Sequence, residues 1–169
     1  MRSRSHTGSL LLLLLVAAVL LRPWETLEEH WQGEPMRSTS GYVTRVVDGD
    51  TVEVELEGEV EDVRYIGVDT PETVKPGAPV DCFGPQASSF NHRLVERRRV
   101  RLVFDAERRD RYDRLLAYVY LGDRFVNAEL VRRGLARTLE IPPNDRFAER
   151  LKRLEIAAAR AGRGLWGAC

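Results

Sequence analysis

Short apolar runs between Tyr42 and Val68 constrain the fold of this chain most. Within each run, apolar side chains alternate with acidic or other polar ones, which is the spacing of a β-strand that buries one face. Asp48-Gly49 and Glu57-Gly58 separate the runs, and Asp-Gly in particular is typical of a hairpin turn. We therefore predict a three-stranded meander.

Helical spacing of apolar residues appears three times further along the chain. The first helix is predicted to begin at Pro85, and the others to cover about 126–133 and 145–161. Asp145 is placed as the N-cap of the last helix because its carboxylate would accept the first unpaired backbone N–H groups.

Two more strand-like runs lie at 100–104 and 115–120, on either side of a charged loop. Five short strands with three interspersed helices predict an α+β fold that is mainly β. The strands are expected to close a five-stranded OB-fold barrel, an architecture that routinely binds nucleic acid.

The start of the chain indicates export. Arg2 and Arg4 precede an unbroken apolar run from Leu10 to Leu21. As a helix this run would rise about 18 Å, which is short of a hydrocarbon core of about 30 Å. Residues 1–24 are predicted to be a signal peptide or an uncleaved N-terminal anchor, and no clear cleavage site decides between them.

The domain organisation follows from length and composition. With 169 residues, the chain has room for one domain behind its leader. Residues 25–40 are polar and without periodicity, so we interpret them as a flexible tether, and 41–169 as the folded domain. We expect the protein to be exported, and either secreted or anchored in the membrane by its N-terminus with the domain facing outward. Membrane contact is expected only through this N-terminal segment.

Charge and cysteine content leave alternatives open. The 26 basic and 26 acidic side chains balance, so net charge indicates no class of partner. Cys82 and Cys169 match no close-spaced zinc or redox pattern. Export would favour a disulfide between them, because its destination is oxidising, and two unpaired thiols are the alternative.

Two acidic turns are the strongest local signal of chemistry. Val47-Asp48-Gly49-Asp50-Thr51 and Val68-Asp69-Thr70-Pro71-Glu72 stand at the ends of predicted strands. Carboxylates from two adjacent loops would suit a hard divalent cation such as calcium or magnesium. Either turn alone has a purely structural explanation, since Asp-Gly forms hairpins and Thr-Pro bends the chain.

Two arginines favour a catalytic interpretation. Arg64 precedes the second acidic turn on the same predicted strand, and Arg114 opens the strand at 115–120. Hydrolysis of a phosphodiester builds negative charge at phosphorus, which guanidinium groups and a metal ion stabilise. A carboxylate such as that of Glu72 would orient or deprotonate the attacking water.

The sequence resembles the staphylococcal nuclease family from about Gly41 to Trp166. Several separated motifs occur in the family's order: Asp-Gly-Asp-Thr, Val68-Asp69-Thr70-Pro71-Glu72, Phe83-Gly84-Pro85-Gln86-Ala87-Ser88, Arg114-Leu115-Leu116-Ala117-Tyr118, Val126-Asn127, Leu130 to Ala136, and Gly164-Leu165-Trp166.

The resemblance implies an OB-fold barrel that binds calcium through Asp50, Asp69 and the Thr70 carbonyl. It implies a hydrolase that cleaves DNA and RNA and leaves 3'-phosphate ends. We expect low sequence specificity, because the contacts are aimed at phosphate rather than at base edges. A non-catalytic OB-fold module that binds nucleic acid is the rival interpretation, and a phosphodiesterase for small nucleotides is a second one. We expect a monomer.

By the same resemblance, Arg64, Glu72 and Arg114 would be catalytic, with Glu72 acting on water and the arginines on the phosphate. Arg111 and Tyr112 are predicted to contact the substrate, Tyr112 through its hydroxyl.

Three features depart from the family pattern. Asp113 stands where relatives commonly carry Gly, and would either pair with Arg114 or simply occupy the turn. The segment 137–143 has no aromatic residue for base stacking. The loop 73–81 has a single Lys, which would weaken its hold on a phosphate backbone.

Overall fold

Strand β1 (Ser38–Asp48) begins three residues before Gly41, the predicted start of the folded domain. The computed structural model describes residues 36–73 and 80–169. The predicted leader 1–24 and the tether up to residue 35 lie outside these residues, whereas Ser38 to Ser40 pair with β5 (Arg99–Val103). Within the described ranges, no helix is long and apolar enough to cross a membrane.

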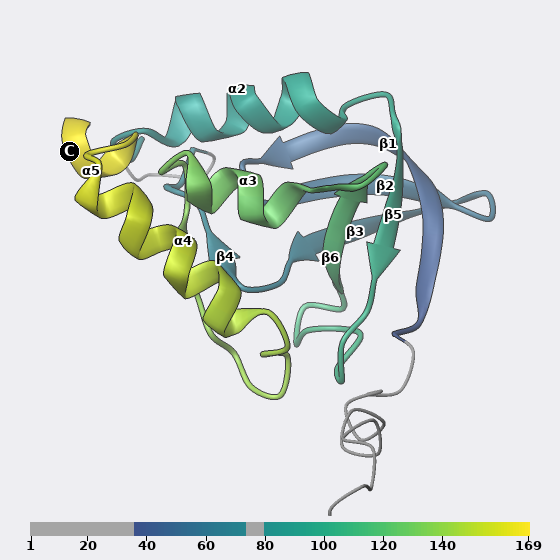
Figure 1. The fold of residues 1–169 in the computed structure, drawn as a ribbon. Helices are drawn as coiled ribbons and strands as arrows, with labels where there is room; N and C mark the ends of the chain where they lie inside the picture. Colours follow the sequence, from purple (N-terminus) through teal and green to yellow (C-terminus); the bar gives the residue numbers. More distant parts are fainter. Residues whose placement is uncertain (1–35, 74–79) are drawn as a thin grey trace, which may run out of the picture. The chain divides into compact units, whose positions relative to one another are not determined.

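Five strands close a barrel, as predicted (Figure 1). β1 pairs antiparallel with β2 (Thr51–Leu56) and with β5. β2 pairs in turn with β3 (Glu59–Tyr65), and β5 with β6 (Leu115–Leu121). A parallel pairing of β3 with β6 closes the ring.

In the closing pair, Arg64 stands opposite Leu116, so the end of β3 lies beside the start of β6. This register brings the two predicted catalytic arginines to the same edge of the barrel.

The period-two pattern of the strands fills the barrel interior. Val52 and Val54 are fully buried on β2, while Glu55 between Val54 and Leu56 faces solvent. Each buried apolar side chain contributes about 1.5 to 3 kcal/mol of transfer free energy. The interior also receives Val43, Val63, Leu102, Ala117 and Val119.

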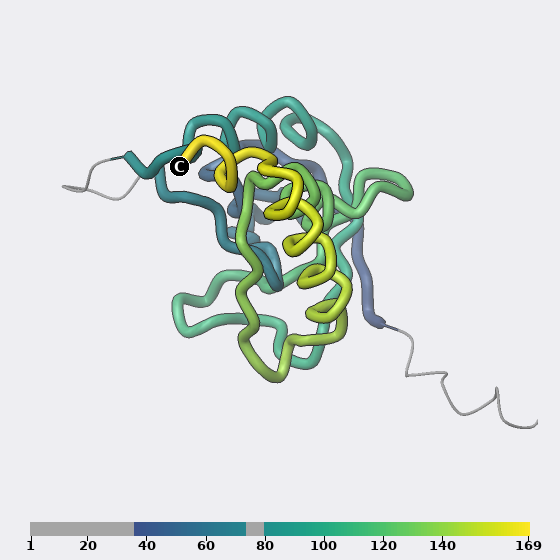
Figure 2. The backbone as a smooth tube through the Cα atoms, turned by 60° about the vertical axis from the view of Figure 1, so that its left-hand side comes forward, coloured from purple at the N-terminus to yellow at the C-terminus, as the bar shows by residue number. Residues whose placement is uncertain are grey.

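Helices cover one side of the barrel. α2 (Gly84–Val95) packs on β1, α3 (Val126–Arg132) packs on β6, and α4 (Ala148–Arg160) packs on α3. These three confirm the predicted helices, and the four-residue α5 (Leu165–Ala168) is added to them. Figures 1 and 2 show the C-terminal residues beside the start of α2, although the two segments are far apart in the sequence.

The prediction of Asp145 as the N-cap of the last helix was wrong. α4 begins at Ala148 after Phe147, with no side-chain cap, and the Asp145 carbonyl accepts the N–H of Ala148 in a preceding turn. The reason lies at Asn144, whose buried amide exchanges hydrogen bonds of 2.8 and 2.9 Å with the backbone of Glu107. These bonds hold the chain in a loop where the helix was expected to start.

Two-residue strands hold the chain in place after β3. β4 (Val68–Asp69) pairs with β8 (Arg137–Thr138), and β7 (Arg124–Phe125) pairs with the end of β6. The fully buried Asn127 accepts the Val119 N–H at 2.9 Å and donates to the Ile66 carbonyl at 2.8 Å. The second acidic turn therefore follows a segment that is anchored to both β6 and α3.

Candidate active site

The two acidic turns meet, as a shared metal site would require. Asp50 lies between β1 and β2 and is buried. Its Oδ2 accepts the Thr70 backbone N–H at 2.7 Å and the Thr70 hydroxyl at 2.9 Å, while Oδ1 accepts the Thr51 hydroxyl at 3.2 Å. These bonds join the first acidic turn to the second.

Arg64 lies between the two predicted carboxylate ligands. Its Nη1 is 2.9 Å from Asp50 Oδ2, and its Nη2 donates to Asp69 Oδ1 at 3.0 Å. Nη1 also donates to the Val68 carbonyl at 2.9 Å. Because the side chain is only 14% exposed and is held at three points, the orientation of the guanidinium is fixed.

Glu72 belongs to the same acidic group. Burial is the main cause that raises the pKa of Asp48, and a hydrogen bond with the Glu72 carboxyl and the charge of Asp50 add to it. Hydrogen bonds from Thr73 and Gly49 to Asp48 act in the opposite direction. Asp48 thus connects the catalytic candidate Glu72 to the turn that carries Asp50.

The site carries an excess of negative charge. Burial raises the pKa of Asp69, and the charges of Asp50 and Glu72 raise it further, although Arg64 opposes them. With Asp48, the two turns carry four carboxyl groups, and Arg64 pairs with two of them, Asp50 and Asp69. In the described part of the chain, no group of three or more His, Cys, Asp or Glu side chains is arranged as a ready metal cluster. The oxygen donors and the concentration of carboxyl groups still fit a hard divalent cation assisted by a backbone carbonyl.

Arg114 immediately precedes β6 and is paired with an acidic side chain. Asp110 Oδ2 accepts its Nε at 2.8 Å and lies 2.7 Å from its Nη2. Burial alone would raise the pKa of Asp110, but the hydrogen bonds from Arg114 and from two backbone N–H groups lower it below its ordinary value. The ion pair orients a guanidinium that is still 30% exposed.

A single pocket of about 480 Å³ contains both arginines. Arg64 and Arg114 line it together with Tyr112 and Arg111, the two predicted substrate contacts. The Arg111 guanidinium lies over the Tyr112 ring, 4.8 Å from its centroid, and donates to its hydroxyl at 2.7 Å. The structure therefore brings the four cationic and phenolic candidates to one cavity.

Part of the lining of this pocket is aliphatic. Leu139 and Ile141 come from the segment 137–143, which lacks aromatic residues, and both side chains are exposed at the pocket. Leu116 of β6 adds a third apolar side chain. A base in this pocket would meet these apolar side chains and the side chain of Tyr112.

Asp113 does not pair with Arg114. It lies in the left-handed region with φ of 66°, which is the conformation that favours Gly. Its carboxylate is 88% exposed and 3.6 Å from Nη1 of Arg109. Of the two expected roles, the structure therefore shows the second, in which Asp113 simply occupies the turn.

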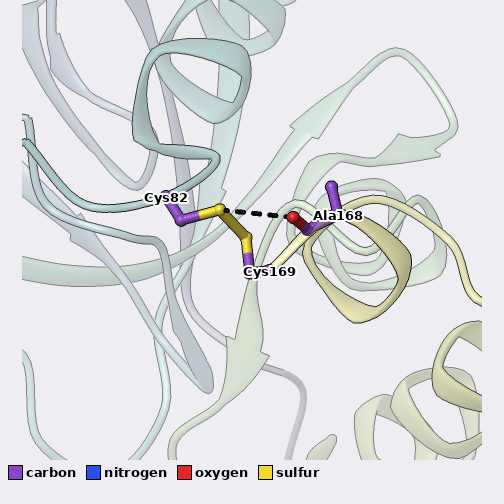
Figure 3. Close-up of a disulfide and its surroundings, with 3 residues drawn as sticks. All are labelled: Cys82, Ala168 and Cys169. Atoms are coloured by element: carbon purple, nitrogen blue, oxygen red, sulfur yellow. Dashed lines mark hydrogen bonds between the residues drawn. A yellow bond between two sulfur atoms is a disulfide. The ribbon is translucent and has the colours of Figure 1, made fainter.

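The two cysteines are joined in a disulfide (Figure 3). Cys82 precedes α2 and Cys169 follows α5, and the Cys82 sulfur lies 3.9 Å from the Ala168 carbonyl oxygen. Both cysteines line a second cavity, of about 370 Å³, with Asp69 and Glu72. The bridge therefore lies next to the acidic group.

Sequence reasoning did not find every residue of the site. Asp110, which orients Arg114, precedes it by four residues in a loop where no periodicity marks it. Asn91 on α2 is fully buried and donates to the Asp48 carbonyl at 3.1 Å, while it accepts the Tyr65 hydroxyl at 3.1 Å. An Asn on the apolar face of a predicted helix was the signal that could have revealed it.

Comparisons with known proteins agree with this geometry. A family model described as staphylococcal nuclease homologue matches residues 62–168. The thermonuclease of Staphylococcus intermedius is 44% identical over 131 residues, which span 78% of this chain and 78% of that protein. The thermonuclease of Staphylococcus hyicus is 44% identical over 124 residues, 73% of each protein. Endonuclease YncB of Bacillus subtilis (strain 168) is 40% identical over 124 residues, 72% of this chain and 59% of that protein.

Proposed function

We propose that this chain, which belongs to the staphylococcal nuclease family, is a calcium-dependent endonuclease that hydrolyses DNA and RNA and leaves 3'-phosphate ends. Membership of the family confirms the broader prediction of a nuclease-type phosphodiester hydrolase. The calcium ion, the two substrates and the product ends are the proposed part.

One observation carries the proposal: Arg64 and Arg114 line the same pocket, and Arg64 also contacts the acidic group. A phosphodiester in this pocket would meet one guanidinium from β3 and one from the loop before β6. Guanidinium groups held in fixed orientations stabilise the charge that develops at phosphorus without reorganising during the reaction.

Glu72 is the proposed partner of the attacking water. Its carboxylate would orient the water and accept its proton as the oxygen bonds to phosphorus. For a 3'-phosphate product, the bond from phosphorus to the 5'-oxygen breaks. Arg114 would stabilise the charge that builds on the phosphoryl oxygens during this step.

Asp50, Asp69 and the Thr70 carbonyl would hold the calcium ion. When bound, calcium would supply positive charge to the phosphate and to the surrounding carboxylates. Hydrogen bonds from the Thr70 backbone N–H and hydroxyl hold Asp50 next to the second acidic turn.

Low sequence specificity follows from the kinds of group that face the substrate. The arginines would contact phosphate groups, which are the same for every base sequence. Leu139 and Ile141 offer apolar contacts to any base. Tyr112 and Arg111 offer planar groups for stacking, and Tyr112 also offers a hydroxyl.

The N-terminal segment and the assembly complete the proposal. Residues 1–24 would act as a signal peptide or an anchor, followed by the tether, so that the nuclease domain works outside the cell membrane as a monomer. Fractionation of cells and medium with an antibody to the domain would separate secretion from anchoring.

End-group analysis tests the reaction. A 5'-labelled oligonucleotide would be digested with calcium, and the fragments offered to a polymerase before and after phosphatase treatment. We expect extension only after phosphatase, because a 3'-phosphate blocks the polymerase. Extension without phosphatase, or binding of the oligonucleotide without cleavage, would contradict the proposal; the second result favours a non-catalytic binding module.

A further inference from the structure

Asp81 is hydrogen-bonded to Glu72 on two sides. The Asp81 backbone N–H donates to the Glu72 carbonyl at 3.0 Å, and Asp81 Oδ2 accepts the Glu72 backbone N–H at 3.1 Å. Asp81 also accepts the Gly84 N–H at its own carbonyl, at the start of α2. The backbone of Glu72 is therefore held by a residue nine positions further along the chain.

The residue after Asp81 is Cys82, and the disulfide ties it to Cys169. Cys169 follows α5, which is fixed to the end of α3 because the Leu165 N–H donates to the Gly134 carbonyl at 2.9 Å. The packing there is so close that a Cβ atom on Gly134 would collide with the Arg163 carbonyl, and one on Gly164 with the Gly134 carbonyl. The bridge thus connects the Asp81 segment to a firmly packed part of the domain.

We propose that Asp81 is a positioning residue for Glu72, that the Cys82–Cys169 disulfide keeps it in place, and that reducing this disulfide lowers turnover. This inference rests on the proposed nuclease function. The bridge joins two residues that are 87 positions apart in the sequence. Without it, the segment around Cys82 is held only by its local hydrogen bonds and gains conformational freedom.

The disulfide is accessible to small thiols, because both cysteines are exposed. A dithiol reductant would attack one sulfur as a thiolate and form a mixed disulfide, releasing the other cysteine as a thiolate. The second sulfur of the reductant then displaces the first cysteine. The protein gains two electrons and two protons and has two thiols, while the reductant becomes a cyclic disulfide.

The effect should fall on the chemical step more than on substrate binding. Arg64, Arg114, Arg111 and Tyr112 lie in the larger pocket, whose lining does not include Asp81 or either cysteine. Displacement of Glu72 would misplace the attacking water, and an error of about 1 Å in such a group costs up to about 100-fold in rate. We therefore expect kcat to fall by at least about tenfold, with KM changed by less than about threefold.

The first experiment measures kcat and KM of the full chain on a single-stranded oligonucleotide with calcium, before and after treatment with dithiothreitol. The matched control is the C82S/C169S double variant, which is expected to show the lowered kcat from the outset and no response to the reductant. Circular dichroism at the assay temperature verifies that each sample is folded. A wild-type kcat that is unchanged although thiol titration detects two new thiols would overturn the proposal.

The second experiment separates positioning from general loss of stability. Asp81→Asn keeps an oxygen that accepts the Glu72 N–H and should retain most of the turnover, whereas Asp81→Ala should lower kcat at least about tenfold with little change in KM. Equal kcat in both variants, or a loss that merely follows the folded fraction, would overturn the role of Asp81. Absence of cleavage by the oxidised wild-type chain would instead reject the underlying nuclease function.

Discussion

Asp110 holds the guanidinium of Arg114 through one carboxylate oxygen, which lies 2.8 Å from Nε and 2.7 Å from Nη2. The same residue also accepts the backbone N–H groups of Tyr112 and Arg114 through its other oxygen. One side chain therefore sets both the path of the loop and the direction of a predicted catalytic group.

Replacing Asp110 should impair catalysis without changing any residue that contacts phosphate. Asp110→Ala leaves Arg114 charged but no longer oriented, so we expect kcat to fall between about 10-fold and 100-fold. Steady-state cleavage of an oligonucleotide measures this change. Asp113→Asn is the control, since Asp113 lies in the same loop but does not contact Arg114, and its kcat should match the wild type. Equal activity of Asp110→Ala and wild type would contradict the orienting role.

Asp113→Gly should stabilise the domain. The left-handed conformation at position 113 strains a residue that carries a Cβ atom, and Gly adopts it without this cost. Because Gly also gains entropy in the unfolded chain, the net increase in the free energy of unfolding should be below about 1 kcal/mol. Urea denaturation measures it, with Asp113→Ala as the control that keeps the Cβ atom. Destabilisation by the Gly variant would show that the Asp113 carboxylate contributes more than the conformation costs.

Acid should weaken the attachment of α4 to β8 through Glu155. Burial raises the pKa of this carboxyl, but hydrogen bonds from Lys152 and from the Thr138 backbone and hydroxyl lower it more, so the net pKa is below its ordinary value. The ionised form is thus favoured by folding, and its contribution is present above the unfolded-state pKa of about 4.3. It is lost as pH falls through the lower folded-state pKa.

The pH dependence of unfolding measures this contribution. Glu155→Gln should remove the acid-dependent part assigned to Glu155, so that the variant and the wild type differ most at neutral pH and converge in acid. Glu149→Gln, on an exposed position of the same helix, is the control and should leave the wild-type profile. A constant difference between Glu155→Gln and wild type from neutral to strongly acidic pH would exclude this linkage.

Calcium should stabilise the folded domain through the acidic group. A ligand that binds only the folded state adds about 2.7 kcal/mol to the free energy of unfolding at 100 times its dissociation constant. Thermal unfolding with and without calcium measures the shift. Asp69→Asn should reduce it strongly, whereas Asp62→Asn, an exposed strand position away from the group, should not. An equal calcium shift in Asp69→Asn and wild type would place the ion elsewhere.

The barrel could be predicted because alternation along a strand reports directly which face is buried. Val52 and Val54 alternate with acids in the sequence and are buried in the structure. The start of α4 could not be predicted in the same way, because it depends on the contact between Asn144 and the Glu107 backbone, 37 residues away. Local capping preference at Asp145 is weaker than that tertiary constraint.

The candidate site was predictable to the extent that it uses consecutive motif residues. Asp50, Asp69 and Arg64 were named from sequence, and the structure places Arg64 in contact with both carboxylates. Asp48 acts through contacts with another segment, and Asp110 acts through contacts within an irregular loop. No rule of sequence spacing predicts either kind of contact. Their roles required the fold.

The most direct test of the account compares Glu72→Gln with wild type on long single-stranded DNA and RNA, with calcium and with excess chelator. The substitution keeps the size of the side chain and removes its ability to accept a proton, so kcat should fall by at least about 100-fold while substrate binding and the melting temperature stay near wild type. Chelator should abolish wild-type cleavage. Cleavage by Glu72→Gln at the wild-type rate, or wild-type cleavage that persists in chelator, would contradict the account.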